Sequence, residues 1–167
     1  MMDGLRCPFN PGPPDPAPMK IAIACDHGGY PLKDALMQVV SSMGHEVVDL
    51  GAHTYDKDDD YPDFARYIGQ ALQHGQVDKG VLLCGSGVGA CIAANKQTGV
   101  RASVCHDVYS AHQGVEHDAM NVLCLGSRII GPQLAEDLVR AFVSAEFSGE
   151  TRHQRRLDKV NALEKAG

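Results

Sequence analysis

Residues 81–96 place the tightest restriction on how this chain of 167 residues can fold. Residues 81–83 are apolar, and so short a run indicates a buried strand of a parallel sheet rather than a helix. Glycines then occupy alternate positions (85, 87 and 89), and an Ala/Ile-rich segment that favours a helix follows them. A strand, a glycine turn and a helix start together make an anion site, because bare N–H groups and the positive helix end point to one place.

Two reactive side chains stand at this turn, Cys84 at the end of the strand and Ser86 within the turn. The helix start and nearby cations would acidify the thiol and make it a usable base or nucleophile. Two other interpretations stay open. Residues 85–90 fit the dinucleotide fingerprint G-x-G-x-x-A, with Asp107 roughly where a ribose-binding acid would lie. The cysteine is also compatible with a purely structural role, since cysteine is often a small core residue.

Strands and helices alternate along the rest of the chain. Apolar runs predict strands at 21–25, 46–50, 79–84, 100–105 and 121–125. Prolines open several of the helices expected between and after them, which span 31–43, 62–75, 108–116, 132–147 and 151–165, besides the short one after the glycine turn. This order predicts an α/β fold: a three-layer α/β/α sandwich, Rossmann-like, with about five parallel strands and a C-terminal helix.

Composition restricts the domain organisation and the partners. Six of the nine prolines fall in residues 1–18, which predicts a disordered Pro-rich leader before a single domain at 19–167. A formal charge of −6 argues against nucleic acid or an anionic membrane as the main partner. The six cysteines show no zinc-like spacing, and the four at or within predicted strands (25, 84, 105 and 124) are expected to be reduced thiols. No signal peptide or membrane span is apparent, so a cytoplasmic location is expected.

Polar residues follow the predicted strands where a site should lie, since ligands of such sheets bind above the carboxyl ends of the strands. These are Asp26, His27, Cys84, Ser86, His106, Asp107, Ser127 and Arg128. The acidic run at 56–60 is interpreted as a solvated loop rather than a metal site. Basic residues at 152, 155, 156 and 159 share one face of the last helix, which is either a solvated face or a phosphate site. His117, before the fifth strand, has either a structural or a catalytic role.

Six motifs, in order, resemble the ribose-5-phosphate isomerase B family, which includes the galactose-6-phosphate isomerase subunits. They lie at 25–29 (CDHGG), 60–62 (DYP), 84–89 (CGSGVG), 93–96 (AANK), 121–123 (NVL) and 152–154 (RHQ), and the resemblance covers residues 19 to about 164. It implies an aldose–ketose isomerase of carbohydrate metabolism, in the pentose phosphate pathway, that interconverts D-ribose 5-phosphate and D-ribulose 5-phosphate through an enediol(ate). It also implies that no metal or other cofactor takes part, and that homodimers or homotetramers share active sites between subunits.

The resemblance assigns roles to individual residues. Cys84 would move a proton between carbons 2 and 1, Ser86 would assist at the sugar oxygens, and His117 would open the furanose ring. Some members use a glutamate where this chain has Ala90, so this chain looks like a cysteine-type enzyme. The remaining positions would contact substrate, with the backbone of 85–89 facing the enediolate and the arginines clamping the phosphate: Asp26, His27, Tyr61, Gly85, Gly87, Val88, Gly89, Asp118, Arg128, Arg152 and Arg156.

One departure from the family pattern concerns the substrate. Many members have asparagine after the ring-opening histidine, where this chain has Asp118. Asparagine can donate a hydrogen bond to a sugar oxygen, whereas an ionised aspartate only accepts. Two alternatives to ribose 5-phosphate isomerisation therefore remain: the same chemistry on a hexose 6-phosphate or tetrose phosphate, and a sugar-phosphate-binding module without catalysis. A dehydrogenase would need a second domain to hold its substrate, and the chain leaves no room for one.

Overall fold

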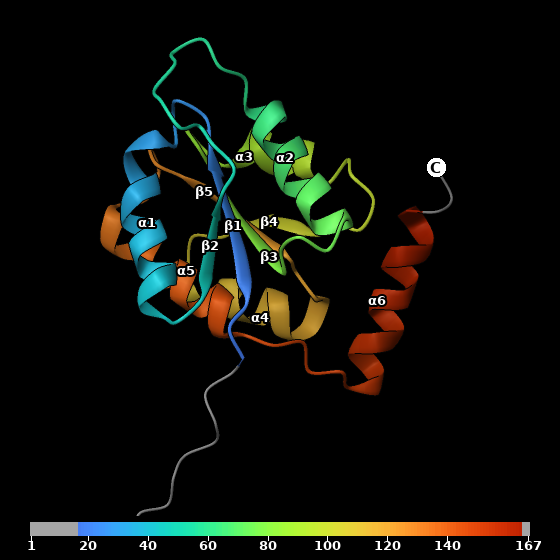
Figure 1. Cartoon of the computed structure of the whole chain (residues 1–167). Coiled ribbons are helices and arrows are strands. Elements are labelled where there is room, and N and C mark those ends of the chain that lie inside the picture. Colours follow the sequence, from blue (N-terminus) through green and yellow to red (C-terminus); the bar gives the residue numbers. More distant parts are fainter. Residues whose placement is uncertain (1–16, 165–167) are drawn as a thin grey trace, which may run out of the picture.

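A computed structural model describes residues 17–164 and shows a twisted sheet of five strands (Figure 1). All neighbouring strands are parallel, in the order β2-β1-β3-β5-β4. The bounds are Lys20–Cys25 for β1, Glu46–Asp49 for β2, Lys79–Cys84 for β3, Ala102–Val104 for β4 and Val122–Gly126 for β5. The expected leader lies outside the described residues, apart from 17 and 18.

Helices cover both faces of the sheet, which confirms the predicted three-layer sandwich. Helices α1 (Tyr30–Ser42), α4 (Val108–Asp118) and α5 (Pro132–Ser144) pack together on one face. Helices α2 (Tyr61–Gln73) and α3 (Val88–Ala94) pack together on the other (Figure 1). Between these layers the core is apolar, and the central strand β3 is buried along its whole length.

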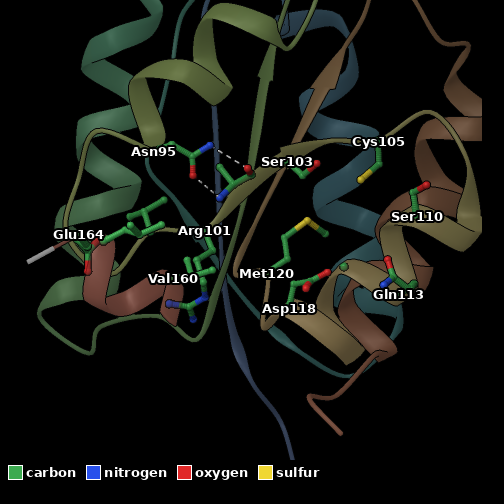
Figure 2. Close-up of a pocket in the computed structure, with 14 residues that line it drawn as sticks. Asn95, Arg101, Ser103, Cys105, Ser110, Gln113, Asp118, Met120, Val160 and Glu164 are labelled. Carbon is green, nitrogen blue, oxygen red and sulfur yellow. Dashed lines mark hydrogen bonds between the residues drawn. The ribbon is translucent and has the colours of Figure 1, made fainter. Parts of the chain in front are cut away.

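The last helix, α6 (Thr151–Glu164), stands away from the body of the protomer (Figure 1). Among its described residues only His153 is buried, whereas Val160 and Leu163 are exposed. Together with α4 and β4, α6 borders a groove of about 680 Å³ (Figure 2). This helix therefore gains little from packing on its own chain.

Several boundaries differ from those expected from the sequence, and the helix expected at 132–147 ends already at Ser144. The fourth strand covers only Ala102–Val104 rather than 100–105. The helix expected to end at 116 continues to Asp118 and ends at Ala119, whose φ of 51° places it in the left-handed region. The expectation that His117 lies beyond this helix is therefore wrong: it is in the last turn.

A buried lysine joins the sheet to α5. Lys79 is 8% exposed, and its Nζ donates to the carbonyl oxygens of Phe142 (2.9 Å), Val143 (3.1 Å) and Ala145 (2.7 Å). Burial lowers the pKa of this ammonium to about 8. The three acceptors lie at the end of α5, where helical carbonyls have no partner within the helix. Lys79 thus satisfies the buried end of that helix.

Replacement of Lys79 by methionine should lower the free energy of unfolding by about 3 kcal/mol, because three carbonyls lose their donor inside the protein. Urea unfolding followed by circular dichroism measures the change. The matched control is Lys20→Met on β1, whose exposed side chain only approaches Glu46 at 3.7 Å, so that a loss below about 0.5 kcal/mol is expected. Equal losses in the two variants would contradict the role given to Lys79.

No helix within residues 17–164 has both the length and the apolar character needed to cross a membrane.

Candidate active site

A cleft opens at the carboxyl edge of the sheet, where the loops after β1 and β3 lie side by side. The chain turns one way from β1 to β2 and the other way after β3, so this is the switch point of the sheet. Its volume is about 320 Å³. The lining residues are Asp26, His27, Gly28, Tyr61, Cys84, Gly85, Ser86, Gly89, Arg128 and Ile129. We call Asp26, His27, Tyr61, Cys84, Ser86 and Arg128 the carboxyl-edge cluster.

The glycine turn holds Cys84 and Ser86 in place. Gly87, with φ of 83°, adopts a conformation that suits glycine and precedes α3. Its N–H donates to Cys84 Sγ over 2.9 Å, and the N–H of Val88 donates to Ser86 Oγ over 3.3 Å. These two amides therefore serve the turn itself. The thiol is only 4% exposed, yet it faces the cleft.

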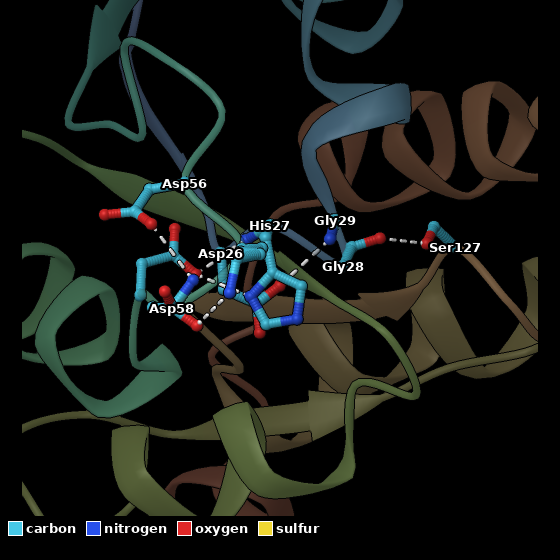
Figure 3. A network of polar contacts seen from close by, with 9 residues as sticks. Asp26, His27, Gly28, Gly29, Asp56, Asp58 and Ser127 are labelled. Carbon is cyan, nitrogen blue, oxygen red and sulfur yellow. Dashed lines mark hydrogen bonds and ion pairs between the residues drawn. The ribbon is translucent and has the colours of Figure 1, made fainter.

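The loop after β1 approaches this turn closely. A Cβ on Gly28 would lie 2.7 Å from the backbone nitrogen of Gly85, so only a hydrogen atom fits there. The hydroxyl of Ser127 donates to the carbonyl oxygen of Gly28 and ties the loop after β5 to the same point (Figure 3). Loops after three neighbouring strands thus form one continuous wall.

His27 and Asp26 bring opposite charges to this wall. His27 Nδ1 lies 2.8 Å from Asp59 Oδ1, and this hydrogen bond is the main reason why the pKa of His27 is raised, while nearby Arg128 opposes the rise. Asp26 is buried and accepts a hydrogen bond from the N–H of Gly29 over 2.9 Å (Figure 3). Burial raises the pKa of Asp26, more than its hydrogen bonds lower it.

The other candidate residues lie at the opposite edge of the sheet. Gly80 pairs with Val122 at one end of the β3–β5 ladder, and Cys84 pairs with Gly126 at the other. Four residues at ~3.3 Å each separate the two ends by about 13 Å. His117 and Asp118 precede Val122, so they lie at the far end from Cys84. We call His117, Asp118, Arg152 and Arg156 the amino-edge cluster.

A stacked histidine pair organises the amino-edge cluster. The rings of His117 and His153 lie 4.1 Å apart with an angle of 27° between them, which places the start of α6, with Arg152, beside the end of α4. His117 Nδ1 lies 2.8 Å from Gln113 Nε2, and the hydroxyl of Ser148 lies 2.7 Å from His153 Nδ1. Burial lowers the pKa of His153, which favours its neutral form beside the arginine.

Three residues that contact members of the two clusters were not predicted from the sequence: Asp59, Gln113 and His153. His153 lies within the RHQ motif that carries the family resemblance, and it is buried in a helix that is otherwise mostly exposed. Nothing in the acidic run distinguishes Asp59 from its neighbours. The residue proposed for a nucleotide ribose has another role, because Asp107 caps α4 by accepting from the N–H of Ser110 over 2.7 Å.

The structure also bears on whether the acidic run at 56–60 can bind a metal ion. Within residues 17–164, no group of three or more His, Cys, Asp or Glu side chains is arranged to hold a metal ion. In this run Asp56, Asp58 and Asp60 are exposed, as expected for a solvated loop, whereas Asp59 is not.

Comparison with known proteins decides the family. A family model described as Ribose/Galactose Isomerase matches residues 21–160. The chain belongs to the ribose/galactose isomerase family. The matched range includes every residue of the two clusters.

Individual members of the ribose/galactose isomerase family are similar over most of the chain. Ribose-5-phosphate isomerase B of Escherichia coli is 43% identical over 145 residues, which are 87% of this chain and 96% of that protein. The structure of ribose-5-phosphate isomerase B from Clostridium thermocellum is 43% identical with a TM-score of 0.84, covering 89% of this chain and 99% of that one. D-erythrulose-4-phosphate isomerase of Pectobacterium atrosepticum is 38% identical over 131 residues, which are 78% and 86% of the two chains.

These similarities identify the protein as an enzyme, an isomerase of sugar phosphates. They set aside the binding module without catalysis that the sequence alone left open.

Proposed function

We propose that this isomerase interconverts D-ribose 5-phosphate and D-ribulose 5-phosphate through an enediol(ate), with Cys84 as the base. The observation that carries the proposal is the content of the cleft: a thiol and the hydroxyl of Ser86 at a glycine turn, with two basic side chains, His27 and Arg128, in the same wall. A sugar phosphate needs a group to move protons at its reacting carbons and cations at its other end.

The proton transfer balances within the substrate. The Cys84 thiolate takes the proton from C2 of the open-chain aldose, and the electrons left behind form the C1–C2 double bond of the enediolate. The thiol then returns the proton to C1, while Ser86 passes a proton between the oxygens on C1 and C2. Amides of the glycine turn other than those of Gly87 and Val88 would face the developing negative charge, and one such donor contributes ~3 kcal/mol in other enzymes.

The phosphate supplies binding energy away from the reacting carbons. Arg128 offers two parallel N–H donors to phosphate oxygens, and His27 adds one more while it is protonated. Fixing the phosphate orients C1 and C2 against Cys84, so that binding at one end of the sugar accelerates chemistry at the other. Arg152 and Arg156 would complete the clamp.

The amino-edge cluster reaches the cleft only from a second copy of the chain, so we propose a homo-oligomer, a dimer or tetramer, with shared sites. In such an assembly His117 of the partner subunit would open the furanose ring. Exposed apolar side chains next to the cleft support this arrangement: Val88 is 55%, Ile92 59% and Ile129 57% exposed. Apolar surface of this kind beside a polar cleft is typical of an interaction surface.

Steady-state assays with a panel of sugar phosphates test the substrate. The value of kcat/KM is expected to be highest with ribose 5-phosphate. A tetrose phosphate is the second candidate, because the relative from Pectobacterium is named as a D-erythrulose-4-phosphate isomerase. Activity with erythrulose 4-phosphate and none with ribose 5-phosphate would transfer the proposal to that substrate.

Asp118→Asn tests the residue that departs from the family pattern. The neutral amide can donate to a sugar oxygen and removes a negative charge from the neighbourhood of the enediolate. We expect kcat/KM for ribose 5-phosphate to rise about threefold to tenfold, by one gained hydrogen bond. Asp137→Asn, an equal change of charge on α5, is the control, and equal effects of the two substitutions would contradict a local role for Asp118.

A further inference from the structure

Asp59 differs from the other aspartates of its loop. Its side chain is 11% exposed, whereas that of Asp58 is 75% exposed. Its Oδ1 accepts from the backbone N–H of His27 over 2.9 Å and lies 2.8 Å from the ring Nδ1. Its Oδ2 is buried and has no hydrogen-bond partner within residues 17–164. Shielding an ionised carboxylate from water in this way lowers the stability of the fold unless a positive charge lies next to it.

We propose that Asp59 is a positioning residue of the active site, which holds His27 as an imidazolium with its Nε2–H directed at the phosphate of the substrate. The proposal deepens the proposed function and rests on it, because it assumes that the anion in the cleft is the phosphate of a sugar. Asp59 itself does not line the cleft; it acts through His27, which does.

The tautomer explains why protonation matters. Because the carboxylate accepts from Nδ1, the ring keeps a proton on Nδ1 in either protonation state, and Nε2 is left for the cleft. In the neutral ring Nε2 carries a lone pair, which repels phosphate oxygens. In the imidazolium Nε2 carries a hydrogen and can donate a charge-assisted hydrogen bond.

The charges around His27 compete. Asp59 and Asp26 favour the imidazolium, while Arg128, across the cleft wall, and partial burial disfavour it. The ring of Tyr55 meets that of His27 edge-on, with 6.5 Å between centroids. The Asp59 hydrogen bond is the largest of these effects, so the pKa of His27 is raised. Two cations, His27 and Arg128, can therefore face one phosphate up to a higher pH than they would without Asp59.

The raised pKa of His27 determines how phosphate binding depends on pH. The imidazolium persists to a higher pH than that of an ordinary histidine, so phosphate binding stays tight until the pH passes the raised pKa. Without Asp59 the loss of binding begins at lower pH. The thiol of Cys84 is not changed by this titration and Arg128 still orients the phosphate, so KM is expected to rise more than kcat falls.

The experiment compares Asp59→Asn with Asp58→Asn. Both substitutions remove one negative charge from the same loop, but Asp58 contacts only Lys57 and the loop itself. Asparagine at 59 has the same shape as aspartate and keeps an oxygen for the N–H of His27. NMR titration of ¹³C-labelled histidine, with His27 assigned by His27→Gln, should show its midpoint about one pH unit lower in Asp59→Asn. No change is expected in Asp58→Asn.

Binding of inorganic phosphate, measured by calorimetry at pH 7.5, is the second readout. Asp59→Asn should weaken binding about tenfold through the lost charge-assisted hydrogen bond, and Asp58→Asn should change it by less than about twofold. In the His27→Gln background, Asp59→Asn should have no further effect, because the residue acts through the histidine. That double variant also separates this role from a general effect on folding.

Two results would overturn the proposal: an unchanged His27 midpoint in Asp59→Asn, or an equal weakening of phosphate binding with and without His27. A wild-type enzyme inactive on ribose 5-phosphate would instead contradict the proposed function, while both readouts remain measurable. The two failures are therefore distinguishable.

Discussion

Cys84→Ala is expected to lower kcat with ribose 5-phosphate about 1,000-fold, because the enzyme loses the group that moves the proton between C2 and C1. The value of KM should change little, since the thiol is small and the phosphate clamp remains. Formation of ribulose 5-phosphate in a steady-state assay measures both constants. This separation of kcat from KM identifies an interaction that is needed for the chemical step rather than for binding.

Cys91→Ala is the matched control for this prediction. Cys91 belongs to α3, directly after the glycine turn, and its thiol donates to the carbonyl oxygen of Ala102 over 3.4 Å, away from the cleft. Its loss should leave kcat close to that of the wild type. If Cys84→Ala kept more than about a tenth of the wild-type kcat, general base catalysis by this thiol would be excluded.

Mixing two inactive variants is expected to restore activity. Cys84→Ala damages the carboxyl-edge cluster and His117→Ala damages the amino-edge cluster. In a mixed dimer one site contains both damaged residues and the other contains neither. Random pairing makes half of the dimers mixed, so about a quarter of all sites are intact and kcat per chain should recover to about 25% of the wild type. Co-expression of the two variants with different affinity tags, followed by the isomerase assay, measures this.

Cys84→Ala mixed with Ser86→Ala provides the control. Both substitutions fall in the carboxyl-edge cluster, so each site of a mixed dimer keeps one damaged residue and no activity should return. Recovery in both mixtures, or in neither, would contradict a site that is shared between subunits.

The fold was predictable from the sequence because local signals agree with one another. Apolar runs, prolines at the starts of α1, α2 and α5, and a glycine turn after β3 all favour the same alternation of strands and helices. The errors lie at the ends of strands and helices. In α4, for example, Ala119 adopts a left-handed backbone conformation and stops the helix two residues later than the apolar pattern suggests. A backbone conformation of that kind leaves no mark in hydrophobic periodicity.

The carboxyl-edge cluster was predictable for a geometric reason, since every member follows a strand end or begins the helix beside it. Two aspects were not. The stacking of His117 on His153 cannot be read from positions along the chain, because it depends on the direction of α6. The role of Asp59 was also not predictable, because the sequence does not distinguish an aspartate whose side chain is shielded from the three exposed aspartates of the same loop.

Helix α6 has a consequence for how the sequence of this enzyme can vary. Fourteen residues form a helix from which the protomer buries one side chain. Substitutions along its outward surface will therefore leave the folding of a single chain almost unchanged, and any harm they do will appear only where another molecule meets that surface. In the homo-oligomer proposed above, selection on this segment would act on the fit between subunits, so changes in α6 and in the surface that it contacts are expected to accumulate together.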